Sequence, residues 1–165
     1  MKIHPKITEF LATGFFISYI PARLTGFKKF TGAGLFGTAL ALGLAPFLPE
    51  SGCGYGVFLA VFLFFSVKVA GAASALYGTH DDPRIVIDEI LGYWVAVAFM
   101  EKTIFSLTFA FIFFRIIDTL KPWPIKRLEQ NTAGGFGIIL DDVAAGIGAN
   151  ILTRALVLFK GILGY

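Results

Sequence analysis

Long apolar stretches separated by short polar turns dominate the chain, and this pattern predicts a series of helices. A membrane span takes about 20 mostly apolar residues, and five of the stretches approach that length. The predicted spans are Phe30–Pro49, Tyr55–Tyr77, Pro83–Met100, Thr103–Leu120 and Ile138–Leu163. No linker or repeat divides the chain. We therefore expect an all-α fold, a compact polytopic transmembrane helix bundle formed by a single domain over residues 1–165.

The N-terminal stretch Ile7–Ile20 is shorter than a span, and basic residues flank it on both sides. A helix lying in the plane of the lipid headgroups, or a re-entrant helix, explains this flanking charge. A sixth span is the alternative. The stretch is also similar to a signal peptide, but Pro21 interrupts the place of a small-residue cleavage site, which favours a retained helix.

Composition supports a membrane setting. Of the 165 residues, 56% are hydrophobic and 15% are charged, and the mean hydropathy is +0.78. Soluble domains average about 25% charged residues, so an ordinary soluble enzyme, a coiled coil and a disordered tail fit poorly. Cys53 is the only cysteine, which excludes an intramolecular disulfide and a cysteine zinc site. The net charge of +3 comes from scattered basic residues, which suit lipid headgroups better than nucleic acid.

The basic residues also predict an orientation, because loops on the cytoplasmic side of a membrane are rich in Lys and Arg. With five spans, one face receives Arg23, Lys28, Lys29, Arg84, Lys121, Lys126 and Arg127. The opposite face receives Glu50, Glu101, Lys102 and Lys160. The first face is therefore predicted to be cytoplasmic.

Acidic residues are concentrated in one part of the chain. Nine of the 11 fall between positions 81 and 142, and seven of these nine are the candidates considered below, namely Asp81, Asp82, Asp88, Glu89, Asp118, Asp141 and Asp142. An ionisable group at membrane depth costs at least about 2.5–3.5 kcal/mol, so selection for stability alone does not explain the set.

Each acidic residue also has a structural interpretation. Asp118 has potential partners three residues away in Arg115 and Lys121. Asp141 or Asp142 is a candidate cap of the last helix, and Asp81 or Asp82 a candidate cap of a helix that starts at Pro83. The basic residues nearby are too few to neutralise all seven carboxylates.

A divalent cation accounts for the whole set. Crowded carboxylates raise one another's pKa unless a positive charge keeps them ionised, and a bound metal is the largest such charge. Oxygen ligands without cysteine and with few histidines favour Mg²⁺ over zinc. Basic residues beside an acidic metal cluster are typical of phosphate chemistry.

Three motifs contain most of these residues: His80–Gly92 (HDDPRIVIDEILG), Phe114–Ile125 (FRIIDTLKPWPI) and Gly134–Gly146 (GGFGIILDDVAAG). They resemble the motifs of the phosphatidylglycerophosphatase A family of bacteria, and Leu11–Phe15 also fits the N-terminus of that family. The resemblance implies Mg²⁺-dependent removal of the terminal phosphate of phosphatidylglycerophosphate, which gives phosphatidylglycerol for phospholipid biosynthesis at the bacterial inner membrane. One stretch departs from the family: Ala33–Thr38 keeps two glycines and a final hydroxyl but lacks the usual proline and first threonine.

The motifs supply the candidate site residues. The predicted metal-binding set is Asp88, Glu89, Asp118, Asp141 and Asp142, and the predicted catalytic residues are Asp88, Asp118, Asp141, Asp142 and His80. The predicted ligands of the substrate phosphate are Arg115, Lys121 and Lys126. His80 would protonate the leaving alkoxide, with a solvated loop histidine as the alternative, and Lys126 would otherwise face lipid headgroups. Both a phospho-aspartate and direct attack by water are compatible with these residues.

A divalent-cation transporter that uses the same carboxylates is the alternative from another class. Its acidic residues would be expected near the middle of the membrane, whereas those of this chain cluster near one interface. The sequence does not predict an oligomeric state.

Overall fold

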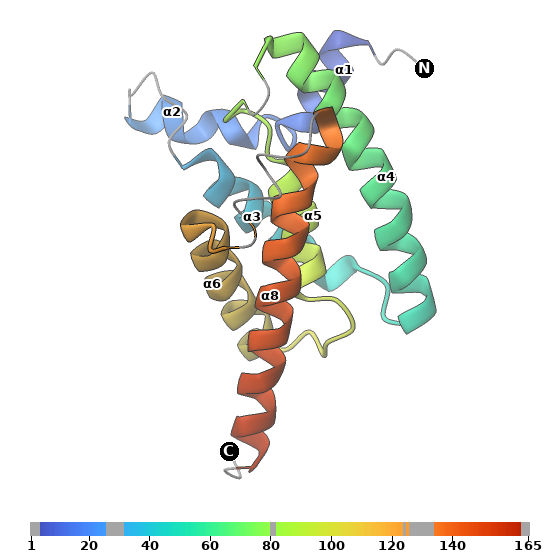
Figure 1. Ribbon diagram of the computed structural model, residues 1–165, viewed down its shortest axis with the longest axis vertical. Helices are drawn as coiled ribbons and strands as arrows, with labels where there is room; N and C mark the ends of the chain where they lie inside the picture. The colour runs from blue at the N-terminus through green and yellow to red at the C-terminus, as the bar shows by residue number, and fades with distance from the viewer. Residues whose placement is uncertain (1–3, 26–31, 80–81, 124, 126–133, 163–165) are drawn as a thin grey trace.

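The computed structural model describes residues 4–25, 32–79, 82–123, 125 and 134–162. These residues form helices and no β-strand, which confirms the predicted all-α class. In chain order the elements are α1 (Pro5–Ala12), the 3₁₀ helix η1 (Ile17–Tyr19), α2 (Ile20–Thr25), α3 (Ala33–Leu44), the 3₁₀ helix η2 (Ala45–Phe47), α4 (Gly52–Tyr77), α5 (Ile87–Ala96), α6 (Ile104–Leu120) and α8 (Gly134–Ile162). In Figure 1 the long helices α4 and α8 run along the bundle, with α5 beside both of them.

Helix α5 forms the centre of the bundle. Eight of its ten residues are buried, and it packs against α3, α4, α6 and α8. Its two large polar rings satisfy their polar atoms internally: the Tyr93 hydroxyl donates to the Leu107 carbonyl (2.9 Å), and Trp94 Nε1 donates to the Ala41 carbonyl (3.0 Å). These bonds fix the rotation of α5, and with it the direction of the two acidic residues in its first turn.

Glycines bring α5 and α8 into backbone contact. A Cβ atom on Gly146 of α8 would collide with the carbonyl oxygen of Gly92 in α5. A Cβ atom on Gly92 would lie 2.8 Å from the carbonyl oxygen of Asp142 and 2.7 Å from the Phe114 ring. The two helices therefore approach each other more closely than any larger residue would permit.

Among the described residues, two helices are long and apolar enough to cross a membrane, α4 with 26 residues and α8 with 29. The other three predicted spans correspond to shorter helices, with 12 residues in α3 before η2, 10 in α5 and 17 in α6. At 1.5 Å per residue α5 covers about 15 Å, half of the roughly 30 Å hydrocarbon core. The described residues therefore do not confirm a bundle of five spans.

The predicted helix Pro83–Met100 is wrong at both ends. The backbone N–H of Val86 donates to the carbonyl of Ala12 in α1 (2.8 Å), which holds the preceding segment outside the helix. At the other end, the Asn150 amide of α8 donates to the carbonyl of Ala98 (3.0 Å), beyond the last turn of α5. Contacts with α1 and α8, rather than the apolar pattern, set the limits of this helix.

The N-terminal stretch is not one helix. Gly14, Phe15 and Phe16 have φ of 57°, 61° and 66°, so the chain leaves the helical conformation after α1. The described helices of this region have eight, three and six residues, too few for the sixth span considered above. In Figure 1 both α1 and α2 lie near the end of the bundle that holds the first turn of α8.

Helix α8 starts at Gly134, earlier than the predicted start at residue 138. A Cβ atom on Gly135 would collide with the carbonyl of Val67 and the backbone of Gly71, so this glycine lets the first turn of α8 pack directly on α4. Residues 134–137, predicted to belong to the loop before the last helix, are therefore helical, and residues 126–133 of that loop lie outside the described part.

Candidate functional site

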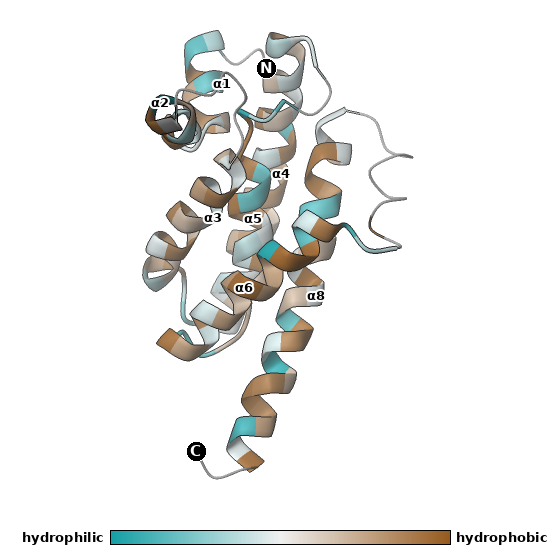
Figure 2. Cartoon of the chain, turned by 90° about the vertical axis from the view of Figure 1, so that its left-hand side faces the viewer, coloured by the Kyte–Doolittle hydropathy of each residue, from teal (hydrophilic) through white to brown (hydrophobic). Residues whose placement is uncertain are grey.

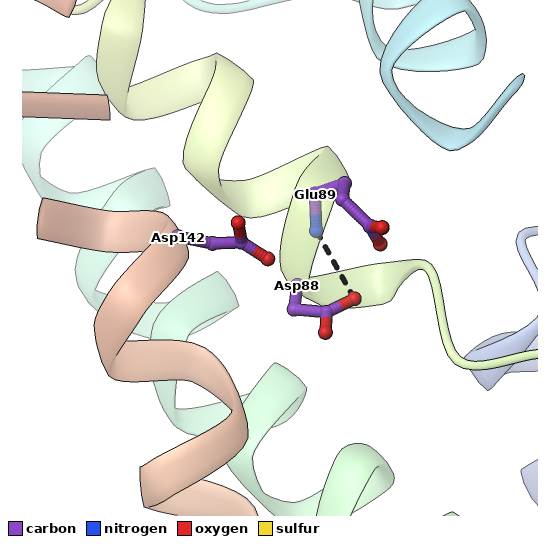
Figure 3. Close-up of side chains that lie close together, drawn as sticks. All are labelled: Asp88, Glu89 and Asp142. Atoms are coloured by element: carbon purple, nitrogen blue, oxygen red, sulfur yellow. Dashed lines mark hydrogen bonds between the residues drawn. The ribbon is translucent and has the colours of Figure 1, made fainter. Parts of the chain in front are cut away.

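Asp88 and Glu89 occupy the first turn of α5. The exposed fraction of Asp88 is 5%, and its Oδ1 accepts the backbone N–H of Glu89 (3.1 Å). Acidic side chains are favoured in the first turn of a helix, where the unpaired backbone N–H groups carry partial positive charge. The helix start therefore accommodates two adjacent carboxylates that point in different directions (Figure 3).

Asp142 of α8 joins this pair. One carboxylate oxygen from each of Asp88, Glu89 and Asp142 lies within 4.8 Å of the other two, and Figure 3 shows Asp142 reaching toward α5 from the facing helix. Asp142 is 4% exposed and lies about two turns inside α8. The structural interpretation of Asp141 or Asp142 as a helix cap is therefore wrong, because the helix begins well before them.

Two oxygens of this acidic group are buried without a hydrogen-bond partner among the described residues. They are Oε2 of Glu89 and Oδ1 of Asp142. A buried carboxylate oxygen without a donor is costly, and more so beside other carboxylates. The arrangement is suited to a bound cation with oxygen ligands.

Within the described part of the chain, two ion pairs flank the three carboxylates, and both cations come from the C-terminal end of α6. Arg115 Nη1 lies 3.0 Å from Asp118 Oδ2, one of the two pairings predicted for Asp118. Lys121 instead lies across from α8, with its Nζ 2.7 Å from Asp141 Oδ2. Lys121 ends α6 with φ of 41°, a left-handed conformation that turns the chain out of the helix.

These seven charged residues line one pocket of about 190 Å³. The remaining wall comes from Gly32, Ala33, Gly34, Pro83, Ile85 and Ile138. Five carboxylates against two cations leave the pocket formally negative even with both ion pairs formed. Such a site can hold a divalent cation and, beside it, an anionic group contacted by Arg115 and Lys121.

The N-terminal half of α3 forms a wall of the site that the sequence reasoning missed. A Cβ atom on Gly34 would collide with the Glu89 carboxylate, so the glycine leaves room for that side chain. Thr38 accepts a hydrogen bond from Arg115 Nη1 (3.1 Å). Both residues fall in the stretch Ala33–Thr38. Its two glycines and final hydroxyl, shared with the family pattern, are the feature of the sequence that could have indicated this wall of the site.

The structure thus brings together most of the predicted site. All five predicted metal ligands line the pocket, but only three of them form the compact group, while Asp118 and Asp141 are engaged in ion pairs. Arg115 and Lys121 also line the pocket, and their role as ligands of the substrate phosphate stays a prediction. Three further candidates, His80, Asp81 and Lys126, lie outside the described residues.

Asp82, a predicted helix cap, has another role. Its carboxylate accepts hydrogen bonds from Arg84 Nε (2.7 Å), Arg84 Nη2 (2.8 Å) and Thr79 Oγ1 (3.0 Å), in the segment between α4 and α5. The hydrogen bonds from Arg84 are the largest influence on the pKa of Asp82, which lies below its usual value. The Arg84 guanidinium also stacks on the Tyr77 ring, 3.6 Å from its centroid. This cluster anchors the segment that leads into Asp88.

Fold and pocket together define an all-helical protein with an acidic, cation-flanked site near one end of its bundle. The chain belongs to the phosphatidylglycerophosphatase A family, whose model matches residues 10–157. The match confirms the resemblance seen in the three motifs and gives no support to the transporter alternative.

Three curated bacterial proteins are similar to parts of the chain. Phosphatidylglycerophosphatase A of Escherichia coli is 43% identical over 71 residues, which are 42% of this chain and 41% of the relative. Phosphatidylglycerophosphatase A of Haemophilus influenzae is 34% identical over 101 residues (61% of this chain, 62% of the relative). A putative phosphatidylinositol-3-phosphatase of Bacteroides thetaiotaomicron is 35% identical over 95 residues (56% and 58%). The chain thus spans less than two thirds of the length of these relatives, and no solved structure matches it.

Proposed function

We propose that this protein hydrolyses the terminal phosphate monoester of phosphatidylglycerophosphate and releases phosphatidylglycerol and phosphate in phospholipid biosynthesis. The observation that carries the proposal is the pocket in which three close carboxylates lie beside Arg115 and Lys121. Two relatives named phosphatidylglycerophosphatase A share the family, which supports the assignment of the reaction.

Mg²⁺ is the proposed cofactor, held by Asp88, Glu89 and Asp142. The donor set contains oxygen atoms only, and the unpartnered buried oxygens of Glu89 and Asp142 fit an ion of this kind. When bound, the ion supplies Lewis-acid polarisation of the phosphoryl group and activation of water. Asp118 and Asp141, the other two members of the predicted metal set, hold the two cations that face the substrate.

Arg115 and Lys121 are proposed to bind the substrate phosphate. The Arg115 contacts with Asp118 and Thr38 both use Nη1, and among the described residues Nε and Nη2 have no hydrogen-bond partner. That free edge of the guanidinium presents two parallel N–H groups, a geometry that matches two phosphate oxygens. Charge neutralisation by these cations stabilises the transition state, in which negative charge spreads over the phosphoryl oxygens. His80 as the general acid and Lys126 as a further phosphate ligand stay predictions.

The protein is proposed to be a multi-pass protein of the bacterial inner membrane. Besides the two long apolar helices, large apolar side chains are widely exposed, for example Phe64 (68%), Ile104 (87%) and Leu158 (69%). Figure 2 shows hydrophobic residues along much of α6 and α8. Exposed apolar surface of this extent is typical of contact with lipid. The shorter helices α3, α5 and α6 would complete the bundle within the bilayer.

The pocket end is proposed to face the cytoplasm at headgroup depth. Asp141 and Asp142 lie about 10–12 Å along α8 from its first residue, at a rise of 1.5 Å per residue. A lipid phosphate at the membrane interface would meet residues at this depth without leaving the bilayer. The excess of basic residues in the loops of this end supports the orientation.

Phosphate release from mixed micelles of detergent and phosphatidylglycerophosphate tests the proposed reaction. We expect turnover that stops in EDTA and returns with Mg²⁺, and that falls by orders of magnitude in Asp88→Asn. Phosphatidylinositol 3-phosphate serves as a second substrate, because one relative carries a name for that activity. Preference for this second lipid would contradict the proposed substrate, and failure to hydrolyse either would contradict the function.

A further inference from the structure

Arg115 is held by two acceptors on different helices. Its Nη1 contacts Asp118 Oδ2 on the same helix (3.0 Å) and Thr38 Oγ1 on α3 (3.1 Å). The side chain of Arg115 is 21% exposed, so it is neither free in solvent nor fully enclosed. The contact with Asp118 joins residues of one helix, whereas the contact with Thr38 links α6 to the wall formed by α3.

Thr38 is suited to receive a guanidinium. It is fully buried, and its hydroxyl donates to the Gly34 carbonyl one turn earlier (2.8 Å). That bond uses the only hydroxyl proton, so a lone pair of Oγ1 remains to accept the Arg115 N–H. The hydroxyl orientation is therefore set by α3 itself.

We infer that Thr38 is a positioning residue that directs the free edge of the Arg115 guanidinium into the acidic pocket. The inference rests on the proposed function in one respect, that the bound anion is a lipid phosphate. With the Nη1 corner fixed by α3 and α6 together, Nε and Nη2 are held ready for phosphate oxygens. Without Thr38, Asp118 is the one direct contact of the guanidinium left among the described residues. A displacement of about 1 Å in such a group can cost up to about a hundredfold in rate.

The test compares Thr38→Val and Thr38→Ser with the wild type, using phosphate release from phosphatidylglycerophosphate in mixed micelles. Thr38→Val keeps the shape but removes the acceptor, and we expect kcat/KM to fall at least about tenfold. Thr38→Ser restores the hydroxyl and should stay within about threefold of the wild type. Full activity in Thr38→Val would overturn the inference.

Thr153→Val is the matched control. Thr153 is also fully buried in a helix, and its hydroxyl also donates to the carbonyl four residues earlier, that of Ala149 (2.8 Å), but it contacts no cation among the described residues. We expect Thr153→Val to leave kcat/KM unchanged within about twofold. An equal loss in both valine variants would mean that Thr38 acts through helix stability alone.

A double-mutant cycle isolates the link to Arg115. In an Arg115→Gln background, Thr38→Val should change kcat/KM by less than about twofold, because the group it positions is absent. If Thr38→Val causes its full loss in that background as well, Thr38 does not act through Arg115.

A second readout does not depend on turnover. In ¹⁵N NMR of the detergent-solubilised protein, the guanidinium signal of Arg115, assigned by its loss in Arg115→Gln, should show slower rotation in the wild type than in Thr38→Val. If the wild type released no phosphate but this difference appeared, the proposed function would fail while the positioning by Thr38 would stand. Equal rotation in both proteins would overturn the inference.

Discussion

The Lys121 ammonium lies 2.7 Å from the Asp141 carboxylate, an ion pair that joins the end of α6 to the third turn of α8. Asp141 is 8% exposed and Lys121 28%, so the pair lies at the edge of the pocket rather than on the open surface. Adjacent residues on a helix point about 100° apart. Asp141 and Asp142 therefore face different partners: Asp141 forms an ion pair with Lys121 at the end of α6, and Asp142 lies beside the carboxylates of α5.

Asp141→Asn should weaken the hold on Lys121 without affecting the metal. We expect kcat/KM to fall about five- to tenfold, roughly 1–1.4 kcal/mol, because a charge-assisted hydrogen bond becomes a neutral one. The Mg²⁺ concentration for half-maximal activity should stay the same, which a Mg²⁺ titration of phosphate release measures. Asp142→Asn is the comparison and should raise that concentration or abolish activity. A similar rise in Asp141→Asn would assign Asp141 to the metal ligands.

Mg²⁺ should also stabilise the protein in the absence of substrate. Three crowded carboxylates repel one another, and a cation bound only to the folded state stabilises it by about 2.7 kcal/mol at a concentration a hundred times its Kd. We therefore expect Mg²⁺ to raise the melting temperature of the detergent-solubilised wild type by about 5–10 °C. Asp142→Asn should lose this rise and, in EDTA, melt no lower than the wild type. A rise of equal size in both proteins would contradict binding by this group.

The contact between α5 and α8 should tolerate no side chain at Gly146. An added Cβ would meet the carbonyl of Gly92, so Gly146→Ala should destabilise the fold by about 1–3 kcal/mol. It should also lower turnover, because Asp142 lies one turn earlier on the same side of α8. Thermal unfolding and phosphate release measure the two effects. Gly43→Ala is the control: nothing lies within 4 Å of the added atom, and the change should be neutral or stabilise by up to about 1 kcal/mol.

Helices whose limits depend on their own residues could be predicted from the sequence. The predicted stretches Tyr55–Tyr77 and Thr103–Leu120 differ from α4 and α6 by three residues or fewer. Ser51 and Thr103 cap these helices with their own hydroxyls, which accept the N–H groups of residues three positions later. Apolar pattern and local capping agree there, so sequence reasoning was sufficient.

Features that depend on distant contacts could not be predicted. Glycines usually indicate a loop, yet Gly135 lies inside α8 because α4 leaves no room for a side chain. Phe15 and Phe16 adopt the left-handed backbone conformation that breaks the N-terminal helix. Residues other than glycine rarely adopt this conformation, so the break could not be predicted there. The acidic cluster was visible as a composition bias, but its division into a close group of three carboxylates and two ion-paired ones follows from helix rotation. The link between Thr38 and Arg115 joins residues 77 positions apart.

The segment leading into Asp88 should lose stability in acid. The hydrogen bonds from Arg84 lower the pKa of the Asp82 carboxyl in the folded state, so the ionised pair stabilises the fold above the unfolded pKa of about 3.9. That contribution is lost as the pH falls below about 4, through the folded value. The free energy of unfolding, measured between pH 6 and pH 2.5, should fall less steeply in Asp82→Asn than in the wild type. Arg84→Gln should reduce the slope similarly, and an unchanged slope in both would contradict the contribution of this pair.

Arg115→Lys should cost at least about tenfold in kcat/KM, or about 1.4 kcal/mol of transition-state stabilisation. Nη1 of the guanidinium contacts Thr38 and Asp118, and the Nε–Nη2 edge is proposed to bind the phosphate. A lysine has one nitrogen, which cannot both keep these contacts and present two parallel donors to the substrate. Steady-state phosphate release at several Mg²⁺ concentrations measures the loss, and added Mg²⁺ should not restore the rate because the missing group is not a ligand. Full rescue by millimolar Mg²⁺ would mean that Arg115 organises the metal site instead of binding the phosphate.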